Sequence, residues 1–187
     1  MIIPLFVFHE LAHAWMALRL GDTTAKDEGR LTLNPIKHID WLGLLFIAVV
    51  GFGWAKPVMI NPANLKNKKR DMAIIALAGP VMNFLLAFLL IFVSVVVFNA
   101  FDIEMLIVLH MAYLSIMLGV FNMLPIPPLD GSKVLAGLLP DNLYEAYRRF
   151  EGFGMVLFII LALTGMLGSI IVPMIQTIFD FMVAVLV

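Results

Sequence analysis

Cysteine is absent from the chain, which excludes disulfide bonds, thiolate metal ligands and cysteine nucleophiles. Charged residues are scarce, with 12 basic and 13 acidic side chains among 187 residues and a net charge of −1. The basic residues do not alternate with aromatic ones as they do in a nucleic-acid-binding groove, so we expect no nucleic acid partner. Any metal site in this chain must therefore use histidine and carboxylate side chains.

Apolar residues, in contrast, make up 63% of the chain, which is more than a soluble domain buries in one core. A helical membrane crossing takes about 20 apolar residues, so the long apolar runs are candidate membrane segments. The sequence predicts an all-α, multi-spanning helical bundle of about five to six membrane segments, with one transmembrane domain over residues 1–187. We expect the first segment to be retained, because no basic residue precedes it as in a signal peptide.

The apolar runs and their breaks indicate where the segments lie. We expect helices over 2–18, 72–99 and 105–121. The region 152–187 is long enough for two crossings, or for one crossing and a surface helix. The run 41–54 is short and contains three glycines, which is typical of a re-entrant excursion as well as of a span.

Charge predicts the orientation of these segments. Basic residues concentrate in three loops, 19–37, 56–70 and 133–149, whereas the turn at 100–104 is acidic. The positive-inside tendency places the three basic loops in the cytoplasm. Both ends of the run 41–54 are then on the same side, which favours the re-entrant reading. We expect the chain to lie in a prokaryotic cell membrane.

The first apolar run carries the polar pattern His9-Glu10-x-x-His13. Residues four apart share a helix face, so the two imidazoles converge, while Glu10 lies one position further round. Zinc is the natural occupant, because it binds neutral imidazole in tetrahedral geometry. Glu10 would then take the proton of a metal-activated water during attack on a peptide carbonyl. Counted from Arg19 at the cytoplasmic end of this helix, His13 lies six residues in and His9 ten, so we expect the site nearer the cytoplasmic side.

The alternative is that these histidines are packing residues bonded to neighbouring carbonyls. Each ionisable group inside a membrane helix costs on the order of 2–3 kcal/mol, so three together favour a functional site. A third ligand is needed, and Asp130 and Asp180 are the candidates. We favour Asp130, because irregular backbone after three prolines is allowed at depth only beside a protein-enclosed cavity. Asp130 could instead be the N-cap of a helix starting at 131 or 132, and Asp180 is more typical of an interfacial acid.

Several motifs together carry a family resemblance. They are FVFHELAHAW (6–15), GRLTLNPIKHID (29–40), GFGWAKPV (51–58), ALAGPVMN (76–83) and NMLPIPPLDG (122–131). In this order, over core residues 5–135, they resemble the site-2 protease family of intramembrane zinc metalloproteases. The C-terminal helices of 152–187 lie outside this resemblance, and we see no counterpart of the regulatory domains that many members carry.

The resemblance implies a zinc endopeptidase that cuts a membrane-spanning segment of a regulatory protein inside the bilayer, as in regulated intramembrane proteolysis. It implies roles for five residues: Zn2+ ligation by His9, His13 and Asp130, general base catalysis by Glu10, and positioning of the substrate or oxyanion by Asn122. The motif 76–83 implies that Asn83 faces the site, where it could position the substrate, although a helix contact is a close alternative.

The resemblance also implies a re-entrant β-hairpin within 22–60, where an unwinding substrate could add a strand. The competing hypothesis is a non-catalytic relative, or a metal-ion transporter that uses the same His/Glu/Asp cluster. A transporter often has inverted repeats, and none is recognisable here. His38 and His110 are single histidines that we expect to serve no metal, His38 being solvated in a polar loop. The oligomeric state and the physiological substrate are not indicated.

Overall fold

The computed structural model describes residues 2–50 and 56–186, and these form helices joined by loops, with no strand in the described ranges. The elements are, in chain order, α1 (Ile2–Arg19), α2 (Thr24–Asp27), η1 (Pro35–Lys37), α3 (Trp41–Val50), η2 (Pro62–Asn64), α4 (Lys68–Phe101), α5 (Leu106–Asn122), α6 (Asp130–Leu138), α7 (Asp141–Leu163) and α8 (Met166–Leu186). The all-α prediction is confirmed in this part of the chain.

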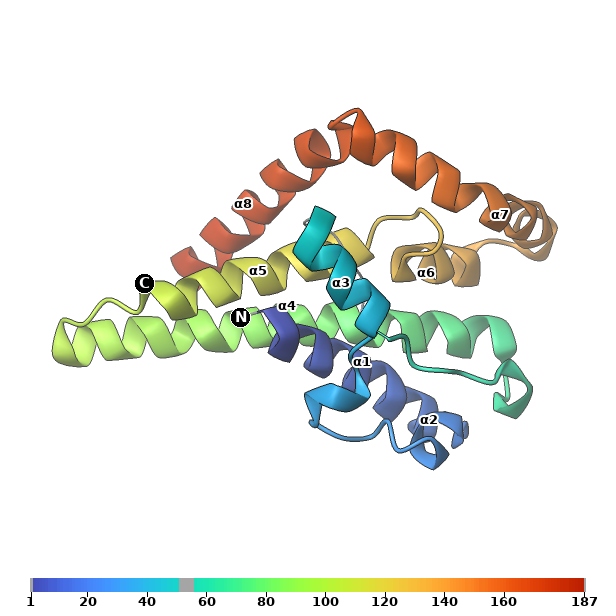
Figure 1. Cartoon of the computed structure of the whole chain (residues 1–187), viewed down its shortest axis with the longest axis horizontal. Helices are drawn as coiled ribbons and strands as arrows, with labels where there is room; N and C mark the ends of the chain where they lie inside the picture. The colour runs from blue at the N-terminus through green and yellow to red at the C-terminus, as the bar shows by residue number, and fades with distance from the viewer. Residues whose placement is uncertain (1, 51–55, 187) are drawn as a thin grey trace.

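Helix α4 is the longest helix in the described residues, and α1, α5 and α6 pack against it (Figure 1). It begins where the side chain of Asn67 accepts a hydrogen bond from the backbone of Arg70, and it ends at Asp102, whose φ of 55° stops the helix. Pro80 is accommodated inside it. The expected helices at 72–99 and 105–121 are both found. Helix α4 extends beyond the expected range at both ends, and α5 is shifted by one residue.

The main apolar core lies between α4, α5 and α8. Its fully buried members include Ile91, Ile116 and Ile175, one from each of these helices. Helices α7 and α8 form a bent pair, because Gly165 adopts a positive φ of 74° at the turn between them. The C-terminal region therefore turns at this glycine, and α8 continues through Pro173.

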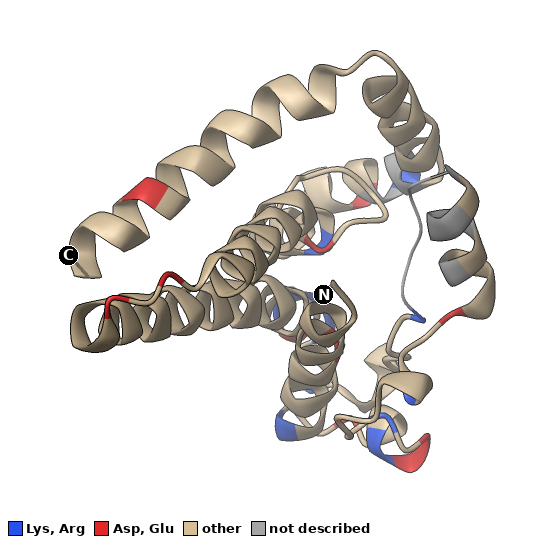
Figure 2. Ribbon diagram, turned by 60° about the vertical axis from the view of Figure 1, so that its left-hand side comes forward, with Lys and Arg blue, Asp and Glu red and all other residues tan. Residues whose placement is uncertain are grey.

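Two helices, α4 and α8, are long and apolar enough to cross a membrane by length and composition, and α5 and the 152–163 part of α7 are shorter apolar helices. Many large apolar side chains on α4 and α8 face outward, as lipid contact requires. Many charged residues lie in loops and near helix ends (Figure 2). Glu10 in α1 and Asp180 in α8 lie inside helices instead. The predicted count of about five to six membrane segments is not confirmed by these helices.

The region expected to hold a β-hairpin contains α2, η1 and α3 in its described part, and no strand. Residues 51–55, which belong to the same expectation, lie outside the described residues. The hairpin is therefore not confirmed. Residues 41–50 of the run 41–54 form the ten-residue helix α3, which is shorter than a membrane crossing.

Candidate metal centre

Helix α1 brings His9 and His13 onto one face, as their spacing of four residues requires. Both imidazoles are buried, and their Nε2 atoms lie 3.0 Å apart. The rings meet edge to face, with centroids 4.6 Å apart. Two nitrogen atoms on one helix are therefore already directed at a common point.

Asp130, which is 121 residues after His9 and 117 after His13 in the sequence, completes the cluster. Its Oδ2 atom lies 3.1 Å from Nε2 of His9 and 3.1 Å from Nε2 of His13. Asp130 is the first residue of α6, and the N-cap is Leu129 with no side-chain cap hydrogen bond. The alternative role of Asp130 as an N-cap is therefore wrong. A Cβ on Gly131 would lie 2.2 Å from the carbonyl oxygen of Met123, so the turn that delivers Asp130 needs glycine there.

The three ligand atoms form a nearly equilateral triangle with sides of 3.0, 3.1 and 3.1 Å. Tetrahedral zinc with bonds of about 2.0–2.1 Å separates neighbouring ligand atoms by about 3.3–3.4 Å. The observed triangle needs to open by only a few tenths of an ångström to match. Among the described residues this is the group of three metal-binding side chains whose ligand atoms converge, and all three are buried. Two imidazoles and one carboxylate are a donor set that suits zinc.

Hydrogen bonds to the outer ring nitrogens show whether the inner ones are available. Nδ1 of His13 lies 2.7 Å from the carbonyl oxygen of Ile75, so Nδ1 carries the proton and Nε2 keeps its lone pair for a metal. Nδ1 of His9 lies 3.3 Å from the side-chain amide of Asn83, whose Oδ1 is buried without a partner. Turning that amide over lets Oδ1 accept the Nδ1 proton of His9, which satisfies the orphaned oxygen and frees Nε2 as a ligand.

One face of α4 forms the wall behind both histidines. Its residues Ile75, Gly79 and Asn83 are spaced four apart, as the two histidines of α1 are. The two helices run past each other in opposite order, so that Ile75 contacts His13 and Asn83 contacts His9. Gly79 sits between them. A Cβ at this position would lie 2.4 Å from Nε2 of His13, so a hydrogen atom is the only side chain that leaves room for the rings.

Glu10 lies outside the ligand triangle. Its Oε2 atom accepts a hydrogen bond of 3.0 Å from the backbone N–H of Val58, and its side chain is partly buried. The three converging donors and the carboxylate of Glu10 are therefore distinct groups in the structure, and the predicted role of Glu10 stays a prediction.

Among the described residues, the hydrogen bonds given below for Asn122, Asp180 and His38 are to partners other than the three ligands. Asn122 donates from its side chain to the carbonyl of Leu118 in its own helix, so its predicted role in positioning stays a prediction. Asp180 is exposed on α8 and accepts from Gln176, and His110 is exposed on α5. The expectation of a solvated His38 is wrong: the residue is buried, and its Nε2 bonds to the carbonyl of Thr32.

Sequence reasoning missed the contacts made by backbone atoms. The carbonyl of Ile75, the hydrogen atom of Gly79 and the N–H of Val58 each touch a site residue, and none of them depends on a chemically distinctive side chain. The signal that was available is the spacing of Gly79 and Asn83, which repeats the spacing of the two histidines.

Comparison with known proteins identifies the family. The chain matches the profile of peptidase family M50 over residues 1–106 and 99–165. It is 38% identical to YwhC of Bacillus subtilis, which is named as a candidate zinc metalloprotease, over 94% of this chain and 84% of YwhC. Rip2 of Mycolicibacterium smegmatis and Rip2 of Mycobacterium tuberculosis, named in the same way, are each 30% identical over 92% of this chain and over 69% and 68% of their own lengths. No solved structure matches the chain.

Proposed function

The chain belongs to peptidase family M50 and is a zinc metalloprotease of the membrane, and on that premise we propose that it cuts a membrane-spanning segment of a protein substrate within the bilayer. The observation that carries the proposal is the buried triangle of His9, His13 and Asp130 in a chain whose surface is largely apolar. A protein with such a surface meets lipid-embedded segments more readily than soluble ones.

We assign the metal to His9 Nε2, His13 Nε2 and Asp130 Oδ2, and the support is their mutual distance together with the free lone pair on each nitrogen. When bound, zinc supplies a Lewis acid that lowers the pKa of water and polarises a carbonyl. The carbonyl of Ile75 and the amide of Asn83 orient the two imidazoles. This replaces the expected substrate-positioning role of Asn83 with the orientation of His9.

Glu10 is assigned as the general base. It is adjacent in sequence to one ligand, yet its carboxylate stays outside the ligand triangle, where it can accept the proton of the attacking water and pass it to the leaving amine. Asn122 is assigned to the substrate or oxyanion. Its amide nitrogen is engaged by Leu118, so the side chain would have to leave that bond when substrate binds.

The finer topology is also a proposal. One transmembrane domain of about five to six membrane segments would place the basic loops 19–37, 56–70 and 133–149, and hence the site, on the cytoplasmic side of a prokaryotic membrane. Because the chain has no cysteine, single cysteines introduced into these loops and into the turn at 100–104 can be labelled with membrane-impermeant reagents. Labelling of both sets from the same side of sealed vesicles would contradict the topology.

The test of the reaction uses purified protein and a model transmembrane peptide in detergent. Glu10→Gln should keep one zinc per chain and lose cleavage, whereas His13→Ala and Asp130→Ala should lose both. Asp180→Ala is the matched control, because it removes an exposed carboxylate outside the cluster and should behave as wild type. Full activity of zinc-loaded Glu10→Gln would refute the assigned base. Zinc binding without cleavage in the wild type would support the non-catalytic alternative instead.

A further inference from the structure

Residues 56–61, here called the strap, pass beside Glu10. The N–H of Val58, near the middle of the strap, donates to Oε2 of Glu10 at 3.0 Å, which leaves Oε1 for other partners. We propose that the strap is a positioning device for the general base, and that two buried charged residues, Arg30 and Asp22, set its place. This inference rests on the proposed role of Glu10.

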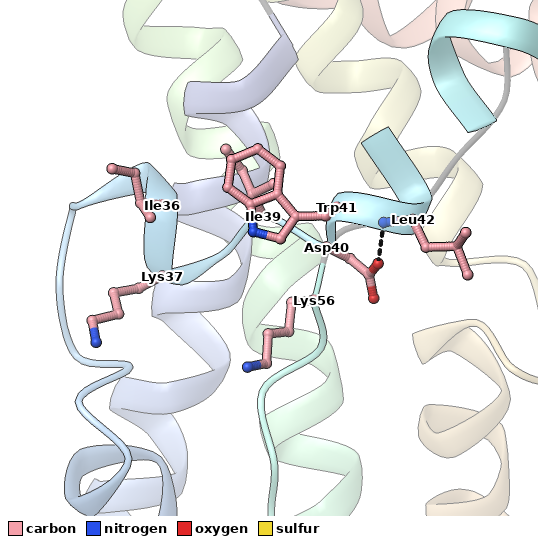
Figure 3. Close-up of a pocket in the computed structure, with 7 residues that line it drawn as sticks. All are labelled: Ile36, Lys37, Ile39, Asp40, Trp41, Leu42 and Lys56. Atoms are coloured by element: carbon pink, nitrogen blue, oxygen red, sulfur yellow. Dashed lines mark hydrogen bonds between the residues drawn. The ribbon is translucent and has the colours of Figure 1, made fainter. Parts of the chain in front are cut away.

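The first anchor is Arg30, of which only 3% is exposed. One guanidinium nitrogen donates to the carbonyl of Lys37 and another to the carbonyl of Lys56, so a single side chain joins the loop before α3 to the start of the strap. The N–H of Lys56 donates in turn to the carbonyl of His38 at 3.0 Å. Lys56 accordingly lies beside Ile39 and the start of α3 (Figure 3). A buried guanidinium is costly unless its donors are used. Nη1 and Nη2 of Arg30 are used on these two carbonyls, whereas its Nε is buried without a partner.

The second anchor is Asp22, which is fully buried. Its Oδ2 accepts from the N–H of Asn61, the last residue of the strap, at 2.8 Å, and its Oδ1 accepts from the side chain of Asn64 at 2.8 Å. Burial alone would raise the pKa of Asp22, but these bonds and those from Thr24 hold it below its usual value, so the carboxylate stays charged. Gly21, with a φ of 104°, makes the turn that leads from α1 to Asp22.

Both anchors are needed because the strap has little apolar burial of its own. Lys56, Pro57, Met59 and Asn61 are exposed, and Val58 and Ile60 are only partly buried. Polar bonds at its two ends therefore decide where it lies. The N–H of Asp22 donates to the carbonyl of Ala17 in α1, the helix that also carries Glu10, so this anchor ties the strap to the same rigid element as the base. A shift of the strap by one residue would remove the N–H from Glu10 and break the bond to Asn61.

The direct test removes the one N–H. Val58→Pro abolishes the donor, and Met59→Pro, which puts the same ring into the neighbouring exposed position, is the matched control. A general base accelerates the reaction by roughly 100- to 10,000-fold, and its positioning accounts for a part of that factor. We therefore expect kcat to fall about tenfold in Val58→Pro, with KM within about twofold of the wild-type value. Zinc content should stay at one per chain, and Met59→Pro should keep the wild-type kcat.

The second test acts at the anchor. Arg30→Gln should lower kcat in the same way, whereas Lys26→Gln, which removes an exposed charge from the same loop region, should not. Because the chain has no cysteine, Met59→Cys provides a single position for a nitroxide label on the strap. Arg30→Gln should sharpen the electron paramagnetic resonance lines of that label, and Lys26→Gln should leave them unchanged.

These results separate the strap from the base itself. Wild-type kcat in zinc-loaded Val58→Pro would overturn the role of the strap, even where Glu10→Gln is inactive. Activity in Glu10→Gln would refute the proposed function instead. If Val58→Pro and Arg30→Gln both lost zinc and stability with no separate fall in kcat, the strap would be a structural element only, and the inference would be wrong.

Discussion

Gly79 gives a sharp test of the metal centre, because one methyl group there would enter the space that the histidine rings fill. A Cβ at this position would lie 2.4 Å from Nε2 of His13 and 2.6 Å from Cε1 of both His13 and His9. Atoms in van der Waals contact stay about 3.5 Å apart, so in Gly79→Ala each ring must retreat by about 1 Å. Zinc ligands tolerate displacements of about 0.2 Å.

The rings have little freedom to retreat. Nδ1 of His13 is held at 2.7 Å by the carbonyl of Ile75, one turn earlier on the same helix as Gly79, and a shift of the ring breaks that bond. Overpacking costs about 1–3 kcal/mol and a lost hydrogen bond about 1 kcal/mol. A total of about 2–4 kcal/mol corresponds to about 30- to 800-fold weaker zinc binding. Helix propensity works the other way, since alanine favours the helix over glycine by about 1 kcal/mol, so the fold should survive.

The assay is competition for zinc between the protein and a chelator of known affinity, with helical content followed by circular dichroism. Gly168→Ala is the matched control, because a Cβ at that position in α8 meets no atom within 4 Å. It should bind zinc as the wild type does. Gly79→Ala with wild-type zinc affinity and wild-type cleavage would refute the reasoning, because the ring positions would then not be set by the wall of α4.

Three further predictions concern the surroundings of the site. Asn83→Leu should weaken zinc binding about 10- to 100-fold. Asn83→Asp keeps an acceptor for the Nδ1 proton of His9 and should retain the affinity for zinc. Equal losses of affinity in the two variants would contradict the assigned tautomer of His9. The pKa of Asp22 is lower in the folded protein than in the unfolded chain, where it is about 3.9. The charged carboxylate therefore stabilises the fold at any pH above about 3.9, and this stabilisation is lost as the pH falls through the pKa of the folded state. Asp22→Asn should therefore lower the unfolding temperature in detergent at pH 7, and the difference from wild type should shrink below about pH 4. Removal of zinc by chelation should lower the unfolding temperature of wild type and of Glu10→Gln alike, and zinc should restore it, whereas His13→Ala should show no such shift.

The helices of the fold were largely predictable, because apolar runs and their stops are local signals. The run 72–99 became α4, whose ends are fixed by Asn67 and Asp102, residues of the kind that begin and end helices. The run 41–54 was harder, since a short glycine-containing segment has no length from which to infer a crossing. Its described part is helical, and the predicted hairpin is not found in the described residues.

The site was predictable where side-chain chemistry is distinctive. His9, His13 and Asp130 are separated by up to 121 residues, yet the first two were linked by helical spacing and the third by its proline-rich setting. His38 was predicted to be solvated, and no prediction was made for Arg30, yet both are buried. A polar side chain in a polar loop gives no local sign that it will be buried. Only the tertiary bonds of these residues to backbone carbonyls explain their burial.

The matched spacing on α1 and α4 has a consequence for how the metal centre depends on the fold. Ile75, Gly79 and Asn83 serve His13 and His9 in reverse order, so the two helices must cross in one register. A slip of α4 by one turn would bring Ile75 or Asn83, each with a larger side chain than Gly79, into the space that the two rings fill. The ligands of α1 can therefore bind zinc with the observed geometry only after α4 has packed, and the affinity for zinc reports directly on that packing.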